Sequence, residues 1–150
     1  MNWKDNKTEV AEFMKQNYPP NFEYQNFGAQ LTMEFFNATK FANIVTNSGA
    51  KYLVFTSKHH DGYTNFNSSY TFGWNSMSVG PKRNVMKELK DAFSTTDPDF
   101  HFGIYYSLFE WFNPLYLKDK RNDFETRSVY DCIKILVCHT SIIKATPNRN

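Results

Sequence analysis

The sequence predicts an α/β fold in which two parallel strands are joined through a helix. Three observations carry this prediction: a nearly continuous apolar run at 51–57, a helical apolar period at 83–94 and a second apolar run at 100–107. A strand, a helix and a second strand in this order form a βαβ unit, whose strands are parallel and whose crossover is right-handed. A further helix expected before the first strand completes the α/β pattern.

The composition fits one soluble globular domain without an internal linker. Of the 150 residues, 41% are hydrophobic and 18% are aromatic, and the formal net charge is +2. These values exclude collagen, coiled coils and low-complexity disorder, and the small charge gives no indication of nucleic-acid binding. No apolar run approaches the roughly 18 residues of a membrane span. The polar start Met1–Lys7 does not have the pattern of a signal peptide.

The first part of the chain is expected to contain a helix followed by an irregular segment. Asn6–Asn17 predicts the helix because its apolar residues recur at helical spacing, and Tyr18-Pro19-Pro20 ends it. The aromatic residues Phe22, Tyr24 and Phe27 indicate an extended or irregular stretch.

A second helix is expected to begin at Asn37, a favourable N-cap. It should end before Gly49, which suits the left-handed position after a last turn. Its expected apolar face consists of Phe41, Ile44 and Val45. The strand that follows, Lys51–Ser57, is so rich in β-branched and aromatic residues that it predicts burial on both faces, as in a parallel sheet.

The remaining elements complete the βαβ unit. Residues 58–80 have no helical period, and their aromatic side chains favour an ordered loop of a length that is usually functional. Pro81 precedes a helix over 83–94, a turn at 96–99 and a strand over 100–107. The helical residues expected to point inward are Val85, Met86, Leu89 and Phe93.

Functional loops of a parallel sheet lie at the carboxyl ends of its strands. Here those ends are Lys58-His59-His60-Asp61-Gly62 and Ser107-Leu108-Phe109-Glu110-Trp111. Because carboxyl ends of parallel strands meet at one edge, we expect His59 and His60 to lie on the same side of the sheet as Tyr105 and Glu110.

The paired histidines His59 and His60 are the most distinctive of these residues, and three interpretations stay open. The imidazoles could bind a metal, hydrogen-bond a polyhydroxylated ligand or cap the strand structurally. A metal needs three or four converging ligands, whereas adjacent residues of a strand point to opposite faces. His101 is expected at the other end of the sheet. These points favour a ligand with hydroxyl groups over a metal.

Other side chains at the strand ends also have open roles. Tyr105 and Tyr106 are expected to point to opposite faces, and core packing with a bonded hydroxyl would explain them without a ligand. Glu110 beside Trp111 suits a sugar, because a ring face stacks on indole while hydroxyls need acceptors, but an ordinary loop explains them equally well. Asp61 and Glu110 could form a carboxylate pair for glycoside hydrolysis, which in a retaining enzyme requires a separation of about 5 Å.

Two further features concern redox chemistry and processing. Cys132 and Cys138 lie too far apart on a helix for a disulfide and lack zinc-binding spacing, so buried free thiols are expected. Sequons begin at Asn6, Asn37 and Asn67 and matter only if the chain enters the secretory pathway.

Several motifs occur in a specific order and spacing from about Trp3 to Phe124. They are Asn17-Tyr18-Pro19-Pro20-Asn21-Phe22, Gly49-Ala50-Lys51-Tyr52, Thr56-Ser57-Lys58-His59-His60-Asp61-Gly62, Trp74-Asn75-Ser76, Val79-Gly80-Pro81-Lys82-Arg83 and the run from Phe102 to Tyr116. In these motifs the sequence resembles the retaining α-L-fucosidases, in particular those of the animal lysosomal type.

The resemblance implies an incomplete (β/α) TIM-like barrel fragment with about two parallel barrel strands and their helices. In the family, the paired histidines after the second barrel strand and the first tyrosine of the third-strand motif bind fucose. These positions match His59, His60 and Tyr105. The expected rim of the pocket consists of Asp61, Glu110 and Trp111.

The resemblance also implies a substrate and a location. The family removes terminal α-L-fucose from glycoproteins, glycolipids or oligosaccharides with retention, using an Asp nucleophile, a separate acid/base and neither metal nor cofactor. Fucosylated glycans are therefore the expected partners, and nucleic acid is not. A lysosomal or secreted location is expected, and full-length relatives are expected to be homo-oligomers.

The expected domains are a partial catalytic barrel at 1–128 and a divergent C-terminal segment at 129–150, helical and then disordered. A complete barrel takes about 250 residues. The nucleophile and the acid/base of the family are therefore expected beyond Asn150. The chain is expected to be a truncated family member that is inactive alone; the alternative is an inactive fucose-binding or regulatory fragment.

Overall fold

The computed structural model of the chain describes residues 8–127. Its elements are α1 (Thr8–Asn17), η1 (Tyr24–Asn26), α2 (Phe27–Gln30), α3 (Ala38–Asn47), β1 (Tyr52–Lys58), η2 (Ser69–Thr71), α4 (Val85–Thr96), β2 (His101–Tyr106) and α5 (Pro114–Arg121). Both predicted strands and the helices predicted after Asn37 and over 83–94 are confirmed, with ends that differ by at most two residues. None of the helices in this range is long and apolar enough to cross a membrane. The predictions for Asn6, Cys132, Cys138 and 129–150 lie outside the described residues.

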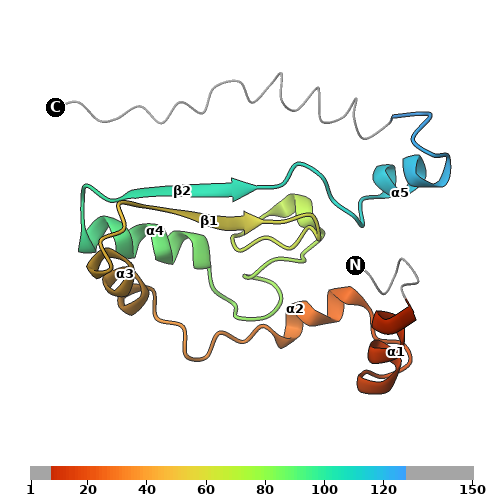
Figure 1. The fold of residues 1–150 in the computed structure, drawn as a ribbon, viewed down its shortest axis with the longest axis horizontal. Coiled ribbons are helices and arrows are strands. Elements are labelled where there is room, and N and C mark those ends of the chain that lie inside the picture. Colours follow the sequence, from red (N-terminus) through yellow and green to blue (C-terminus); the bar gives the residue numbers. More distant parts are fainter. Residues whose placement is uncertain (1–7, 128–150) are drawn as a thin grey trace.

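The two strands β1 and β2 pair in parallel, as predicted, and form the one sheet within residues 8–127 (Figure 1). Tyr52 lies opposite His101, and Thr56 lies opposite Tyr105. The register shifts between Thr56 and Lys58. Parallel pairing places both carboxyl ends at one edge of the sheet, and the loops with the candidate site residues begin there.

The core lies between the sheet and the two helices α3 and α4, which cover one face of it (Figure 1). Its buried members are Ala42, Val85, Leu89, Ala92, Phe93 and Phe100. Leu53 and Phe55 of β1 and Phe102 of β2 pack against this cluster. The helices thus hold the sheet from one side and leave its carboxyl edge free for the loops.

The opposite face of β1 is not covered by any element within residues 8–127. Tyr52 is 69% exposed and Val54 is 56% exposed. The prediction that this strand is buried on both faces is therefore wrong, because the described helices lie against one face only and strand side chains alternate. An apolar face of this kind normally packs against another part of a protein.

The inward face of α3 includes two of the predicted residues, because Val45 packs against the core and the Phe41 ring lies 6.3 Å from the ring of Phe93. The prediction is wrong for Ile44, and the most deeply buried residue of the helix is a small one. Ala42 is fully buried, and Ala38 packs against the core, whereas Ile44 is 69% exposed. The ends of the helix follow the predicted pattern. Asn37 accepts a hydrogen bond from the backbone N–H of Lys40 (2.9 Å), and Gly49 after the last turn has φ of +85°.

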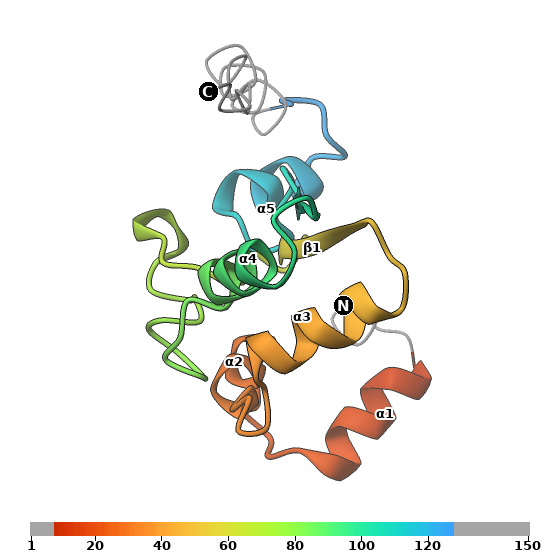
Figure 2. The ribbon, with the colours of Figure 1, turned by 90° about the vertical axis from the view of Figure 1, so that its left-hand side faces the viewer.

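Residues 24–30 are helical, which corrects the prediction of an extended or irregular stretch for Tyr24 and Phe27, whereas Phe22 lies outside any helix or strand. Tyr24 in η1 packs edge-on against Trp74 and at a tilt against Phe112, with ring centroids 6.2 Å and 5.4 Å away. These partners are distant in the sequence, so the local pattern could not indicate the conformation. The helix before this segment, α1, lies farther from the sheet than α3 does (Figure 2).

Buried polar groups order the long loop from 58 to 80, as its aromatic content predicted. Thr64 and Ser76 are almost fully buried, and the N–H of Ser76 donates to the carbonyl of Thr64 (2.8 Å). Trp74 Nε1 donates to the carbonyl of Gln25 (3.1 Å). The loop is therefore attached both to itself and to the N-terminal segment.

Candidate functional site

The two histidines of the site follow the last residue of β1 and lie side by side. The ring centroids of His59 and His60 are 4.4 Å apart, with 64° between the ring planes. Because β1 ends at Lys58, strand alternation no longer applies to them, and the expectation that they point to opposite faces is wrong. The N–H of Gly62 donates to the carbonyl of His59 (3.0 Å) and closes the turn that holds the pair.

Two aromatic residues from β2 and its loop complete the cluster at the carboxyl edge. The Tyr105 ring stacks on His59 at 5.7 Å, and Trp111 lies 6.3 Å from His59 and 5.4 Å from His60. The N–H of Trp111 donates to the carbonyl of His60 (2.7 Å), which fixes one loop to the other. The structure thus brings together four predicted site residues at the predicted edge.

A buried ammonium group joins the two strand ends. Lys58 is 1% exposed, its Nζ lies 3.1 Å from Glu110 Oε1, and it donates to the carbonyl of Ser107 (2.7 Å). The same Nζ lies 4.8 Å from the centroid of the Tyr106 ring, within range of a cation–π attraction. The sequence does not distinguish Lys58 as a site residue, because lysine is normally exposed. Its position directly before the paired histidines was the one feature of the sequence that could have indicated that Lys58 belongs to the site.

The substitution Glu110→Gln is expected to lower the free energy of unfolding by about 2 kcal/mol, because it leaves a buried ammonium without its carboxylate. Lys58→Met is expected to lower it by less. The Glu110 side chain is 29% exposed, so water can solvate the carboxylate that remains. Urea unfolding of both variants measures the two changes.

A surface ion pair supplies the control for these variants. Lys87 and Asp91 pair on the exposed side of α4. Asp91→Asn is expected to change the free energy of unfolding by less than about 1 kcal/mol, because exposed pairs contribute little. A greater loss of stability in Lys58→Met than in Glu110→Gln would contradict the role given to the buried charge.

Asp61 is half-buried next to the histidines. Burial raises the pKa of its carboxyl above the ordinary value of 3.8, and its backbone hydrogen bonds and the charges of His59 and Lys58 oppose this only in part. Burial and the charge of Asp61 also raise the pKa of the Tyr24 phenol. A residue of the N-terminal segment therefore lies within electrostatic reach of the site, which the sequence did not indicate.

The raised pKa of Asp61 predicts a pH-dependent effect on stability. Between the ordinary pKa of 3.8 and the higher pKa of the folded chain, the folded chain keeps a proton that the unfolded chain releases. Ionisation of Asp61 therefore lowers stability as the pH rises through this window. Asp61→Asn is expected to melt at a higher temperature than the native chain near neutral pH, and the difference should vanish below pH 3.8. Thermal melts test this, with the exposed Asp99→Asn as the control; equal shifts in both variants would count against it.

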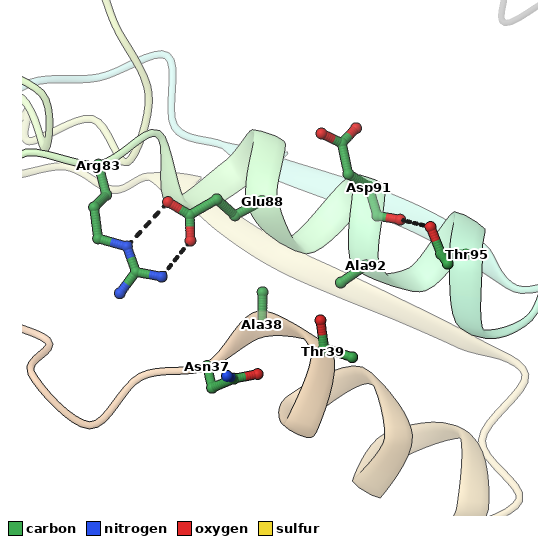
Figure 3. A pocket seen from close by; sticks show the side chains of 8 residues that line it. All are labelled: Asn37, Ala38, Thr39, Arg83, Glu88, Asp91, Ala92 and Thr95. Atoms are coloured by element: carbon green, nitrogen blue, oxygen red, sulfur yellow. Dashed lines mark hydrogen bonds and ion pairs between the residues drawn. The ribbon is translucent and has the colours of Figure 1, made fainter.

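The other polar groups of the described chain add no ligand to this cluster. Within residues 8–127, no three His, Cys, Asp or Glu side chains gather closely enough to hold a metal ion. A hollow of about 430 Å³ lies between α3 and α4, where Arg83 Nε donates to Glu88 Oε1 (3.0 Å) (Figure 3). None of the residues that line this hollow belongs to the strand-end site, so the two are separate.

Comparison with known proteins relates the whole arrangement to one family. The family model described as Alpha-L-fucosidase matches residues 1–141, which extends past Phe124 into the segment after residue 128. The plasma α-L-fucosidase of Homo sapiens is 50% identical over 126 residues, which are 83% of this chain and 27% of that protein. An α-L-fucosidase of Branchiostoma floridae is 51% identical over 118 residues, or 79% of this chain and 26% of that protein. The chain therefore spans about a quarter of the length of these relatives.

Solved structures give the same result. The crystal structure of a Thermotoga maritima α-fucosidase in complex with fucose has a TM-score of 0.68 and 28% sequence identity. The similarity covers 91% of this chain and 34% of that chain.

Proposed function

Because the chain belongs to the α-L-fucosidase family, we propose that it supplies the part of an α-L-fucosidase active site that holds the fucose. The observation that carries this proposal is the cluster of His59, His60 and Tyr105 where the two parallel strands end. Imidazole and phenol groups donate and accept hydrogen bonds, as sugar hydroxyls require. The rings of Tyr105 and Trp111 add apolar faces for the C–H side of the sugar.

The surrounding fold is proposed to be part of a (β/α) barrel. In this proposal β1 and β2 are two barrel strands, α3 and α4 lie outside them, and the exposed face with Tyr52 and Val54 belongs to the barrel interior. Asp61, Glu110 and Trp111 form the rim of the pocket. The ion pair of Lys58 with Glu110 supports this proposal, because it fixes the rim to the end of β1.

The proposed reaction of the complete enzyme is hydrolysis of terminal α-L-fucose on glycoproteins, glycolipids or oligosaccharides with retention. Such a reaction needs a carboxylate nucleophile and an acid/base, which we place outside residues 1–150.

A lysosomal or secreted location is proposed from the plasma and tissue fucosidases among the relatives. The exposed sequons at Asn37 and Asn67 would then be accessible to glycosylation. Homo-oligomers are proposed for the full-length relatives.

L-Fucose is expected to shift the NMR signals of His59, His60 and Tyr105 in the isotope-labelled chain. His60→Ala is expected to weaken binding by about 5- to 10-fold, because one lost hydrogen bond costs about 1 kcal/mol. His101→Ala is the matched control, since His101 is exposed at the opposite end of β2. Equal weakening by both variants, or shifts that avoid the cluster, would overturn the proposed pocket.

A further inference from the structure

The hydroxyl group of Ser107, the first residue after β2, is held against His60. Ser107 is 3% exposed, and its backbone is fixed twice to Lys58. Its N–H donates to the Lys58 carbonyl (3.1 Å), and its carbonyl accepts from the Lys58 ammonium (2.7 Å). Its Oγ contacts His60 Nδ1 and lies 3.1 Å from the carbonyl oxygen of Phe109.

The two contacts of this hydroxyl determine where its one proton lies. A carbonyl oxygen only accepts, so the proton of Ser107 must point to Phe109 for that bond to form. The lone pair of Oγ then faces His60 Nδ1, which must carry a proton to make the second bond. A neutral imidazole has a single N–H, so Nε2 of His60 is left as a hydrogen-bond acceptor.

The acceptor atom Nε2 has no protein hydrogen-bond donor within residues 8–127. His60 is half-buried beside His59 and Trp111, at the edge where the ligand pocket is proposed. We propose that Ser107 is a positioning residue that fixes His60 as the Nδ1–H tautomer, so that Nε2 accepts a hydrogen bond from a ligand hydroxyl. The identity of that ligand, fucose, rests on the proposed function.

The alternative tautomer would change two contacts at once. If His60 carried its proton on Nε2, Ser107 would donate to Nδ1, and the carbonyl of Phe109 would lose its donor. The site would then offer an N–H to the ligand instead of a lone pair. The tautomer therefore determines whether His60 donates a hydrogen bond to the ligand or accepts one from it.

The tautomer can be read directly from imidazole ¹⁵N chemical shifts of the full chain at alkaline pH, where the ring is neutral. For His60 we expect Nδ1 to give the signal of a protonated nitrogen and Nε2 that of an unprotonated one. Ser107→Ala is expected to move His60 toward the Nε2–H form, and Ser107→Thr, which keeps the hydroxyl, is expected to restore the native pattern. His101 supplies a reference signal in the same spectra. An Nε2–H signal in the native chain, or no change in Ser107→Ala, overturns the proposal.

Addition of L-fucose separates this inference from the proposed function. The expected result is a shift of the His60 Nε2 signal and about 5-fold weaker binding by Ser107→Ala than by Ser107→Thr. If the native chain has the Nδ1–H tautomer and fucose shifts neither histidine, the tautomer assignment is supported and fucose as the ligand is overturned. If fucose binds but His60 carries its proton on Nε2, the role of Ser107 is overturned while the pocket stands.

Discussion

The purified chain is expected to release no nitrophenol from an aryl α-L-fucoside under conditions in which an active α-L-fucosidase does so. Retaining hydrolysis needs a nucleophile that forms a glycosyl–enzyme intermediate and an acid/base about 5 Å from it. We place both outside this chain, which covers 27% of the human relative. In the proposed pocket, His59, His60 and Tyr105 orient the sugar, but orientation without bond-making groups leaves most of the barrier in place.

Two carboxylates at the strand ends provide the critical test of this expectation. The Glu110 carboxylate is held 3.1 Å from the ammonium of Lys58, and burial raises the pKa of Asp61. If either group acted as nucleophile or acid, the native chain would show turnover, and Glu110→Gln or Asp61→Asn would abolish it. That outcome would mean that the catalytic carboxylates lie within residues 1–150. Fucose binding without turnover in all three chains is the expected result.

The fold and the position of the site were predictable wherever local chemistry decides the conformation. The apolar runs and the intervening helical period predicted parallel strands, and parallel pairing alone places the loops after β1 and β2 at one edge. Asn37 was predictable as a cap because its short side chain reaches the N–H of Lys40 within one turn.

The features that escaped prediction depend on partners that are distant in the sequence. Lys58 is buried because Glu110 and the Ser107 carbonyl neutralise and bind its ammonium, and neither partner could be assigned to it from the sequence. The helical turn at Tyr24 is stabilised by packing against Trp74. The histidine rings lie side by side because they belong to the turn after Lys58, where the His60 carbonyl accepts from the N–H of Trp111, so strand alternation does not extend to them.

Gly80→Ala is expected to lower the free energy of unfolding by about 3 kcal/mol or more, or to prevent folding. Gly80 has φ of +87°, and a Cβ there would lie 2.4 Å from the carbonyl oxygen of Gly28 and 2.8 Å from that of Leu31. Both obstacles are backbone atoms around α2, so relief of the clash requires movement of that segment. A left-handed alanine costs about 1–2 kcal/mol by itself, and overpacking adds about 1–3 kcal/mol.

The matched variant Gly73→Ala separates the two contributions. Gly73 has φ of +78° and lies in the same long loop, but a Cβ there would meet no atom within 4 Å. Its expected cost is therefore only the roughly 1–2 kcal/mol of the left-handed backbone. Urea unfolding of both variants measures the difference, which we attribute to the contact of the loop with the segment around α2. Equal losses in the two variants would show that this contact does not stabilise the chain, and that the loop carrying Gly80 can separate from the N-terminal segment without cost.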